Sequence, residues 1–477
     1  MSLEIYEINT LNWLNELSIK HGKKINLNNI PDNEIKDIQD LGFNAVWLMG
    51  VWQRSPKALE INKNDPIFMS EVNTLLPKDR LAHLVGSAYS IKDYSLNPVL
   101  GVWQDLLDFK KLLNERNIKL ILDFVPNHVA LDHVWTKKYP EYFIKATDEV
   151  AASQSNNFTN IEGHNYALGR DPHYEPWVDV VQLNAFSENL RHEAASVLKN
   201  ISSVADGVRC DMAMLFLNQI FSSTWGKLAG DIPNTEYWQS VISEVREVCP
   251  ELIFIAEAYW HSGEKLVSLG FNYVYDKDFY DCLWSENYDF LRLYLSRPLS
   301  EQHSSLRFIE NHDEPRAASH VFKVHRMAAA ILVTTPGAHL FYHGQLSGKK
   351  IKMPVQLSMD SKENKNKKVS SFYRELFVAK ENVGDPSNRF ELLLIEPQYE
   401  DVLCWRWEYN ESVFITAVNY NNRLQNFRVD LIKKPRKAEL IFSTSKKIRR
   451  LVELNDDGLW ISLAPHQVII LKINLYL

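Results

Sequence analysis

Short apolar segments alternate eight times with longer segments of helical spacing along this sequence. Strand-like segments that alternate with helix-like segments are typical of parallel sheets in α/β proteins, because parallel strands need a crossover connection. Eight such units in one chain predict a closed (β/α)8 TIM barrel. The predicted strands cover residues 5–10, 45–49, 119–125, 207–211, 252–256, 272–275, 306–309 and 338–342.

Three segments interrupt this alternation. A long loop is expected over residues 50–97, after the second strand. An irregular insertion rich in Asn, Asp, Pro, Tyr and His follows the third strand. From about Glu391, turn signals separate short runs with two-residue alternation, as in an antiparallel β-sandwich. We therefore expect the barrel at residues 1–129 and 181–385, a short inserted domain at 130–180 and a C-terminal β-sandwich domain at 386–477.

Composition and charge exclude several classes of protein. Hydrophobic residues make up 45% and charged residues 24% of the 477 residues, which is ordinary for a globular protein. A net charge of −7, spread along the chain, gives no reason to expect nucleic acid or an anionic membrane as a partner. We expect no signal peptide and no membrane span, because the first residues lack a charged leader followed by an apolar core and no run is long enough to span a bilayer. Because the four cysteines are scattered as free thiols would be, we expect a cytoplasmic protein.

Charged side chains gather where the predicted strands end. In a (β/α)8 barrel the active site lies at the C-terminal ends of the strands. Carboxylates collected at one rim repel each other, so a fold tolerates them only where cations or function compensate. Four strand ends therefore predict one functional site, and they carry Asp123 and His128, Arg209 and Asp211, Glu257, and His312 and Asp313.

Arg209 and Asp211 are two positions apart on the fourth predicted strand. That spacing places both side chains on the same face of the strand. A guanidinium that hydrogen-bonds a carboxylate keeps it ionised, and nucleophilic attack at a sugar carbon requires an ionised carboxylate. Taken alone, the pair is more often a structural ion pair, but its place among the other strand ends favours a functional role.

This set of motifs resembles that of the α-amylase family, glycoside hydrolase family 13. The matching segments, in the family's order, are Asp123-Phe124-Val125-Pro126-Asn127-His128, Gly207-Val208-Arg209-Cys210-Asp211, Glu257 and Asn311-His312-Asp313. Residues 179–184 resemble the motif near the end of the family's inserted domain, and residues 86–94 its tyrosine stretch after the second strand. The resemblance implies a catalytic barrel, an inserted domain and a C-terminal β-sandwich.

The resemblance also implies roles for the matching residues. Asp211 would be the nucleophile, Glu257 the general acid/base, and Asp313 the carboxylate that stabilises the charged transition state. We expect the two histidines to be neutral, because a neutral imidazole donates a hydrogen bond without adding charge. The binding and orienting residues would be Arg209 beside Asp211, Asp123 behind Arg209, Tyr89 beneath the sugar, and His128 and His312 at its hydroxyls.

The implied reaction is cleavage of α-glucosidic bonds by a retaining glycoside hydrolase, through a covalent glycosyl-enzyme intermediate. A transglycosylase or phosphorylase with a sucrose-, trehalose- or maltose-type donor would use the same intermediate and stays open. Met214 and Leu215 stand where many α-amylases carry a Lys-His pair toward the leaving group. With the long loop and the short insertion, this difference favours a pocket, and hence a short α-glucan or α-glucoside as substrate.

We expect no required cofactor and assign no metal ligand. Asn127 matches a calcium ligand of many family members, but Leu215 replaces a histidine that belongs to that site. Two alternatives from other classes are open. A metal-dependent barrel hydrolase could use the strand-end side chains as ligands, and an amylase-like carbohydrate-binding protein would typically lack one catalytic carboxylate. The oligomeric state is left open.

Overall fold

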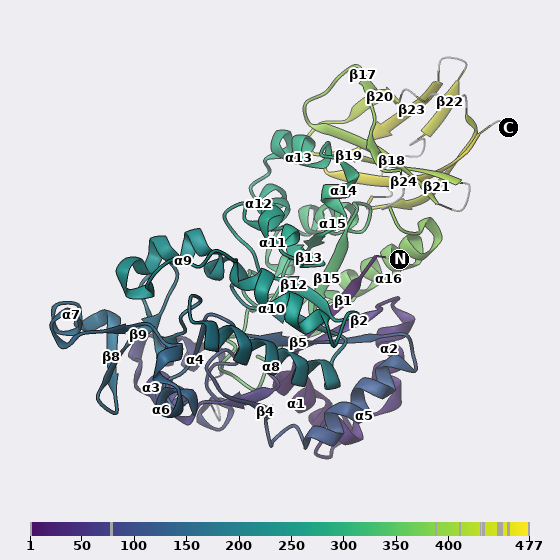
Figure 1. Cartoon of the computed structure of the whole chain (residues 1–477). Helices are drawn as coiled ribbons and strands as arrows, with labels where there is room; N and C mark the ends of the chain where they lie inside the picture. The colour runs from purple at the N-terminus through teal and green to yellow at the C-terminus, as the bar shows by residue number, and fades with distance from the viewer. Residues whose placement is uncertain are drawn as a thin grey trace.

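The computed structural model describes residues 2–76, 80–386, 389–409, 412–429, 431, 435–445, 452–455 and 458–475. Its centre is a closed barrel of parallel strands, which confirms the predicted (β/α)8 barrel (Figure 1). The strands follow the order β1-β15-β14-β13-β12-β11-β5-β2 around the barrel. Their bounds are β1 (Glu4–Asn9), β2 (Ala45–Met49), β5 (Lys119–Phe124), β11 (Gly207–Cys210), β12 (Ile253–Ala256), β13 (Tyr273–Tyr275), β14 (Ser305–Arg307) and β15 (Ala338–Tyr342).

The barrel strands are buried on both faces, and β2 illustrates the arrangement. Its residues Ala45, Trp47 and Met49 belong to the cluster inside the barrel, whereas Val46 and Leu48 pack with the helices outside. Successive side chains of a strand point to opposite faces, so both faces need apolar residues. This double burial explains why the strands are continuous apolar runs in the sequence.

The six predicted barrel helices are present, with ends shifted by a few residues. They are α2 (Asp32–Asp40), α5 (Trp103–Asn114), α8 (Glu188–Val204), α10 (Tyr237–Arg246), α15 (Phe322–Leu332) and α16 (Lys367–Val383). Further helices are α1 (Thr10–His21), α9 (Asn218–Trp225), α11 (Gly263–Ser268), α12 (Lys277–Trp284), α13 (Tyr288–Leu295) and α14 (Leu299–Gln302). In the described part of the chain, none of the helices has both the length and the apolar character needed to cross a membrane.

The prediction of a long loop over residues 50–97 is wrong. Residues 77–79 of this segment lie outside the described part of the structure. The segment contains β3 (Trp52–Arg54), α3 (Pro56–Asn64), α4 (Pro66–Leu75) and β4 (Ile91–Leu96). Ser55 and Asp65 cap the two helices, and each cap is followed by a proline at the first helical position. Both signals are typical of helix starts.

The insertion after the third strand is more regular than predicted. Its antiparallel sheet has the order β6-β10-β9-β7, with β8 paired to β9. The strands are β6 (His128–Ala130), β7 (Lys145–Ala146), β8 (Phe158–Ile161), β9 (His164–Gly169) and β10 (Trp177–Gln182), and two short helices, α6 (Trp135–Lys138) and α7 (Asp148–Ser153), lie between them in sequence. These strands are short and polar, so their two-residue period is weak in the sequence. The division into domains at residues 130, 181 and 386 stays a prediction.

Two antiparallel sheets beyond the barrel confirm the predicted β-sandwich (Figure 1). One has the order β16-β18-β19-β24-β21 and the other β17-β20-β23-β22. Ile415, Phe427, Ile461 and Leu471 are among the buried side chains between them. The strand bounds are β16 (Glu391–Leu392), β17 (Ile395–Glu396), β18 (Val402–Tyr409), β19 (Ser412–Asn419), β20 (Gln425–Val429), β21 (Pro435–Ser443), β22 (Val452–Asn455), β23 (Gly458–Leu463) and β24 (Gln467–Leu475).

Candidate active site

The predicted strand-end residues meet at one end of the barrel. The ladder continues past the last strand residues, because Asp211 N–H donates to the Phe124 carbonyl (2.9 Å) and Glu257 N–H to the Cys210 carbonyl (3.0 Å). Asp211 and Glu257 therefore occupy equivalent positions at the ends of β11 and β12. This is the rim where (β/α)8 barrels carry their active sites.

Arg209 joins the two carboxylates. Its Nη1 lies 2.5 Å from Asp211 Oδ1, and its Nη2 lies 2.8 Å from Glu257 Oε2. Asp123 Oδ1 is farther away, at 4.0 Å. Burial lowers the pKa of Arg209, but Glu257 and the other acidic neighbours outweigh burial and hold that pKa well above its ordinary value. One permanent cation thus contacts two carboxylates. The contact with Asp211 was predicted from the sequence, and the contact with Glu257 was not.

Three aromatic rings surround the Arg209 guanidinium. The ring centroids of Trp47, Tyr89 and Tyr275 lie 5.1, 5.4 and 5.5 Å from its central carbon. Arg209 Nε also donates to the Tyr275 hydroxyl, at 3.2 Å. Cation–π contacts of this kind stabilise a desolvated guanidinium and fix its plane. The rings leave the cation little freedom to turn away from the carboxylates.

Glu257 is held at both carboxyl oxygens. Met212 N–H donates to Oε2 at 2.6 Å, and the Tyr259 hydroxyl donates to Oε1 at 2.8 Å. Burial raises the pKa of Glu257 to about 7, with Asp211 and Asp313 acting in the same direction and Arg209 opposing them. A carboxyl group of this kind keeps its proton near neutral pH, which suits a general acid.

Met212 supplies its N–H from an unusual backbone conformation. Its φ is 45°, in the left-handed region that residues other than glycine rarely adopt. The chain turns sharply here, directly after Asp211, and the turn presents the N–H to Glu257. Strained backbone of this kind is common at functional sites, where surrounding structure holds it.

Asp211 and Asp123 are both buried carboxylates. Burial raises the pKa of Asp211, and Arg209 opposes that change. Burial also raises the pKa of Asp123, to about 6. Asp123 accepts hydrogen bonds from Trp47 Nε1 (3.2 Å) and Gly50 N–H (2.9 Å). Gly50 has φ 76°, and a Cβ there would meet Ala88 at 2.9 Å, so only glycine presents this N–H without strain.

His312 and Asp313 form a second charged group with Glu7 of β1. His312 Nδ1 lies 2.6 Å from Glu7 Oε1, and its Nε2 lies 2.9 Å from Asp313 Oδ2 and 2.9 Å from the Tyr89 hydroxyl. Burial lowers the pKa of His312, but Asp313 and Glu7 outweigh burial and raise that pKa to about 10. The expectation of a neutral His312 is therefore wrong, because two carboxylates flank the ring.

His128 behaves as the sequence analysis expected. Burial lowers its pKa to about 4, so the ring is neutral. Its centroid lies 5.1 Å from that of Trp177 on β10. The neighbouring Asn127 accepts a hydrogen bond from Gln182 Nε2 at its side-chain oxygen, at 2.9 Å.

The metal-dependent alternative finds no support in this geometry. Asp211 and Glu257 both contact the Arg209 guanidinium, so each already has a cationic partner. Among the described residues, no three His, Cys, Asp or Glu side chains are arranged to hold a metal ion together. The negative charge of the carboxylates is instead compensated by two side chains of the protein, Arg209 and His312.

Several residues of the site were missed by the sequence analysis. Glu7, Trp47, Tyr259 and Tyr275 contact the predicted residues directly. Tyr259 follows Glu257 by two positions, which is a signal that could have been used. Glu7 lies 305 positions from His312, so only the closed barrel brings the two together.

Met214 and Leu215 belong to the short 3-10 helix of residues 213–216 that follows Asp211. Both are buried, and they belong to the main hydrophobic cluster. They therefore pack inside the protein, and their apolar character carries no information about the leaving-group side. The Met214-Leu215 pair, one of the three observations that favoured a small substrate pocket, therefore no longer supports it.

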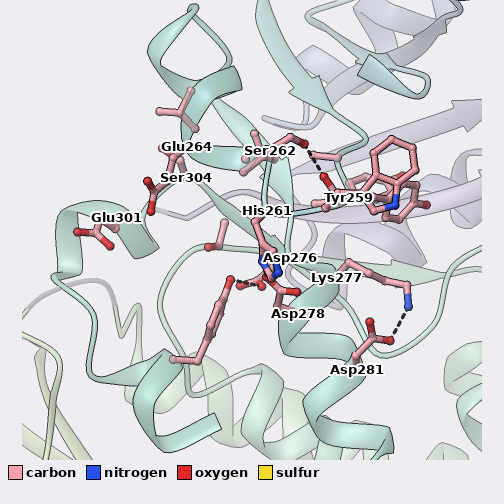
Figure 2. Close-up of a pocket in the computed structure, with 18 of the residues that line it drawn as sticks. Tyr259, His261, Ser262, Glu264, Asp276, Lys277, Asp278, Asp281, Glu301 and Ser304 are labelled. Atoms are coloured by element: carbon pink, nitrogen blue, oxygen red, sulfur yellow. Dashed lines mark hydrogen bonds and ion pairs between the residues drawn. The ribbon is translucent and has the colours of Figure 1, made fainter. Parts of the chain in front are cut away.

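A cavity of about 1150 Å³ is lined by sequence neighbours of Asp211 and Glu257 but not by these two residues themselves. Its lining includes Met212, Tyr259 and Tyr275, and it continues along α11, α12, α13 and α14 (Figure 2). The lining also contains exposed aromatic side chains, among them Tyr174 (75% exposed) and Trp260 (41%). Aromatic faces of this kind can pack against sugar rings.

Comparisons with known proteins agree with this architecture. The model of the family described as alpha amylase, catalytic domain, matches residues 28–390. Alpha-amylase 3 of Dictyoglomus thermophilum is 23% identical over 287 residues, which cover 54% of this chain and 53% of that protein. The chain thus spans about half the length of this curated relative.

Two solved structures share the fold along nearly the whole chain. A noncanonic maltogenic alpha-amylase from Thermotoga neapolitana aligns with a TM-score of 0.69 and 21% identity, covering 99% of both chains. The trehalose-6-phosphate hydrolase of Bacillus licheniformis aligns with a TM-score of 0.68 and 14% identity, again covering 99% of both chains. At these identities the likeness shows the fold alone.

Proposed function

Because the chain belongs to the α-amylase family, we propose that it is a retaining glycoside hydrolase that cleaves α-glucosidic bonds of short α-glucans. The observation that carries this proposal is the contact of one guanidinium, that of Arg209, with both Asp211 and Glu257. The shared contact supports a paired role for the two carboxyl groups, Asp211 as nucleophile and Glu257 as acid. Retaining glycosidases use two carboxylates about 5–5.5 Å apart in this way.

In the first step, the Asp211 carboxylate attacks the anomeric carbon of the sugar. The bond from that carbon to the leaving-group oxygen breaks, and Glu257 gives its proton to that oxygen. Asp313 is placed to stabilise the positive charge that develops on the sugar, because His312 lowers the pKa of its carboxyl group against the effect of burial. The carboxylate is 46% exposed, so it can reach a bound substrate.

In the second step, water attacks the anomeric carbon and the bond to Asp211 breaks. Glu257 removes the proton from the attacking water and returns to its protonated form. Two inversions restore the original configuration. A pKa near 7 suits both roles of Glu257, since neither protonation state is then strongly disfavoured near neutral pH.

Tyr89, His128, His312 and Asp123 complete the proposed site. Tyr89 stacks on His312 with ring centroids 5.5 Å apart, and its hydroxyl lies 2.9 Å from His312 Nε2. His128 is neutral and can donate a hydrogen bond to a sugar hydroxyl. Asp123 orients Trp47, whose ring packs against the Arg209 guanidinium.

Proteins of this fold act on different substrates, since the similar structures include a maltogenic alpha-amylase and a trehalose-6-phosphate hydrolase. The cavity of about 1150 Å³ lined by Met212 and Tyr259, which hydrogen-bond to Glu257, supports a leaving group longer than one small aglycone. Comparing kcat/KM on maltose, maltotriose, maltoheptaose and soluble starch tests the preference. Steadily rising efficiency with mid-chain products from starch would instead indicate an endo-acting amylase.

The non-catalytic alternative is tested by replacing the two reacting carboxylates. Asp211→Asn removes the nucleophile and Glu257→Gln removes the transferable proton, so each variant should lower kcat by several orders of magnitude while the fold stays intact. NMR of the first product formed by the wild type should show the α-anomer. Activity within tenfold of wild type in either variant, or an initial β-anomer, would contradict the assignment.

Cellular location and assembly also remain proposals. We propose a cytoplasmic location from the four scattered cysteines, which are free thiols. We propose no nucleic-acid partner, given the net charge of −7.

A further inference from the structure

Glu7 is a buried carboxylate of β1, and its side chain hydrogen-bonds to one other residue in the described part of the chain. Glu7 Oε1 lies 2.6 Å from His312 Nδ1 and accepts the His312 backbone N–H at 3.3 Å. The second oxygen, Oε2, is buried and accepts no hydrogen bond from the described residues. A buried carboxylate without a compensating cation is strongly disfavoured, so Glu7 depends on a positive charge at His312.

Both nitrogens of the His312 ring face carboxylates. Nδ1 faces Glu7, and Nε2 lies 2.9 Å from Asp313 Oδ2. An ionised carboxylate only accepts hydrogen bonds, so each nitrogen must carry a proton to bond its neighbour. A neutral ring has one proton for two nitrogens and would place a lone pair against one of the carboxylates. The Tyr89 hydroxyl, also 2.9 Å from Nε2, can accept from the same proton as Asp313.

The surrounding side chains that the structure describes bring no other cation to Glu7. Besides Asp313, the titratable side chains that interact with Glu7 or with the His312 ring are Tyr275 of β13, Glu310 after β14, Tyr342 of β15, Asp123 of β5, and Tyr89. Three arginines lie near members of this set, and each has other partners. Arg209 and Arg316 pair with other carboxylates, and Arg54 donates to backbone carbonyls. His312 is therefore the group that compensates Glu7.

The same ring also acts on Asp313. Burial raises the pKa of Asp313, but His312 outweighs burial, together with two other cations, and lowers that pKa to about 2. His312 acts at hydrogen-bond distance from the carboxylate, whereas Lys352 Nζ donates to the Asp313 backbone carbonyl. A ring that kept only the proton at Nδ1 would present a lone pair to the Asp313 carboxylate, and this effect would be lost.

We propose that Glu7 is a positioning residue for the proposed glycosidase reaction. It keeps the His312 ring doubly protonated and fixed, and the ring in turn holds Asp313 as an oriented carboxylate. Glu7 acts through His312 and does not touch the substrate, because its side chain is fully buried. The proposal rests on the proposed function, in which Asp313 stabilises the positive charge that develops on the sugar.

NMR of isotope-labelled histidine side chains tests the protonation of the ring without an activity assay. The His312 signals are those that disappear in His312→Gln. In the wild type, Asp313 and Glu7 outweigh burial and raise the pKa of His312 to about 10, so the ring should stay doubly protonated up to about pH 9. Glu7→Gln keeps an acceptor oxygen but removes the charge, so the ring should lose its second proton about 1–3 pH units lower.

The kinetics should follow the ring. Between about pH 6 and pH 9, the loss of kcat/KM in Glu7→Gln relative to the wild type should grow by at least about tenfold, because the variant ring loses a proton that the wild-type ring keeps. The loss should appear in kcat more than in KM, since Asp313 acts on the transition state. Glu7→Asp keeps the charge, so any loss in this variant should not change with pH.

Glu4→Gln is the matched control, because Glu4 is a second buried carboxylate of β1 that pairs with a buried histidine. Glu4 Oε1 lies 3.0 Å from His339 Nδ1, and Lys380 is its other ion-pair partner. None of these three side chains contacts a proposed catalytic carboxylate among the described interactions. The variant should leave the His312 signals and the pH dependence of kcat/KM as in the wild type.

The outcomes separate this proposal from the proposed function. A neutral His312 ring in the wild type at about pH 8 would overturn the proposal, even if Glu7→Gln does not fold. A loss of activity in Glu7→Gln that is the same at every pH, with unchanged His312 signals, would mean that Glu7 only supports the fold. If the wild type cleaves no α-glucan while the His312 signals behave as expected, the proposed function fails and the link between Glu7 and His312 stands.

Discussion

Arg209 is the residue on which the electrostatics of the site depend. It contacts the proposed nucleophile and the proposed acid, and three aromatic rings hold its plane. The contact with Asp211 is a hydrogen bond of 2.5 Å, whereas the contact with Glu257 is an ion pair without hydrogen-bond alignment. The cation therefore favours ionisation of Asp211 more directly than that of Glu257.

The pH dependence of kcat/KM should follow these two carboxyl groups. Catalysis needs Glu257 protonated and Asp211 ionised. Because burial raises the pKa of Glu257 to about 7, activity should fall as the pH rises through that value. The pKa of Asp211 is also raised. On the acid side, activity should therefore fall at a pH above the ordinary pKa range of an aspartate. A profile that is flat from about pH 4 to 9 would count against a carboxylic general acid.

Tyr259 should tune the acid, because its hydroxyl donates to Glu257 Oε1. A hydrogen bond to a carboxylate favours the ionised form, so Tyr259→Phe should raise the pKa of Glu257. We expect the alkaline limb of kcat/KM to move up by about one pH unit, since a charged hydrogen bond contributes about 1.5–3 kcal/mol. Tyr399→Phe in the β-sandwich is the control. An unmoved limb would show that the Tyr259 hydroxyl has no electrostatic role.

Sequence analysis found the carboxylates but not their full surroundings. Asp211 and Glu257 follow apolar strands, so their place at the rim could be predicted. The charge of His312 could not be predicted, because it depends on Glu7, which lies 305 positions earlier in the sequence. Contacts of this kind exist only after the strands have closed.

At the scale of single elements, apolar strands and long helices were predicted well, and short elements were not. The eight barrel strands are buried on both faces, which produces a strong sequence signal. The helices α3 and α4 were missed although Ser55-Pro56 and Asp65-Pro66 mark their starts. The strands of the insertion are short and rich in polar residues, so their pattern is weak.

The cap of α3 should contribute to stability. Ser55 Oγ accepts the Ala58 N–H at 2.9 Å and donates to Asp132 at 2.5 Å, which links α3 to the insertion. We expect Ser55→Ala to lower the free energy of unfolding by about 1–2 kcal/mol, measured as the shift of the urea midpoint. Ser70→Ala on exposed α4 should change it by less than about 0.5 kcal/mol. Equal effects would mean that the cap is not used.

At the scale of the whole molecule, two tryptophans of β18 join the sandwich to the barrel. Trp405 Nε1 donates to the Thr334 carbonyl at 2.8 Å, and Trp407 Nε1 to the Val383 carbonyl at 3.1 Å. Both side chains are fully buried and belong to the hydrophobic cluster of the barrel. The sandwich therefore completes the barrel's core on this side.

Replacing Trp405 should weaken the barrel as well as the sandwich. Trp405→Ala removes a buried side chain and should cost about 3–5 kcal/mol, so thermal inactivation of the enzyme should shift to lower temperature. Trp460→Ala on β23, which is only half-buried, is the matched control and should have a smaller effect. An unchanged inactivation temperature with Trp405→Ala would indicate that the barrel is stable without this contact.

The pairing of β1 with β15 has a consequence for how the protein is made. Glu4 lies opposite His339 in the register of these strands, and Lys380 forms an ion pair with Glu4. In the nascent chain, β1 therefore lacks its neighbour β15 until about residue 342 has left the ribosome. The charge on His312 depends on Asp313 and on Glu7 of that same strand, so the proposed active site acquires its electrostatic character only when the barrel closes. Ribosome-bound chains that stop before β15 would carry every proposed catalytic carboxylate and still lack a working site.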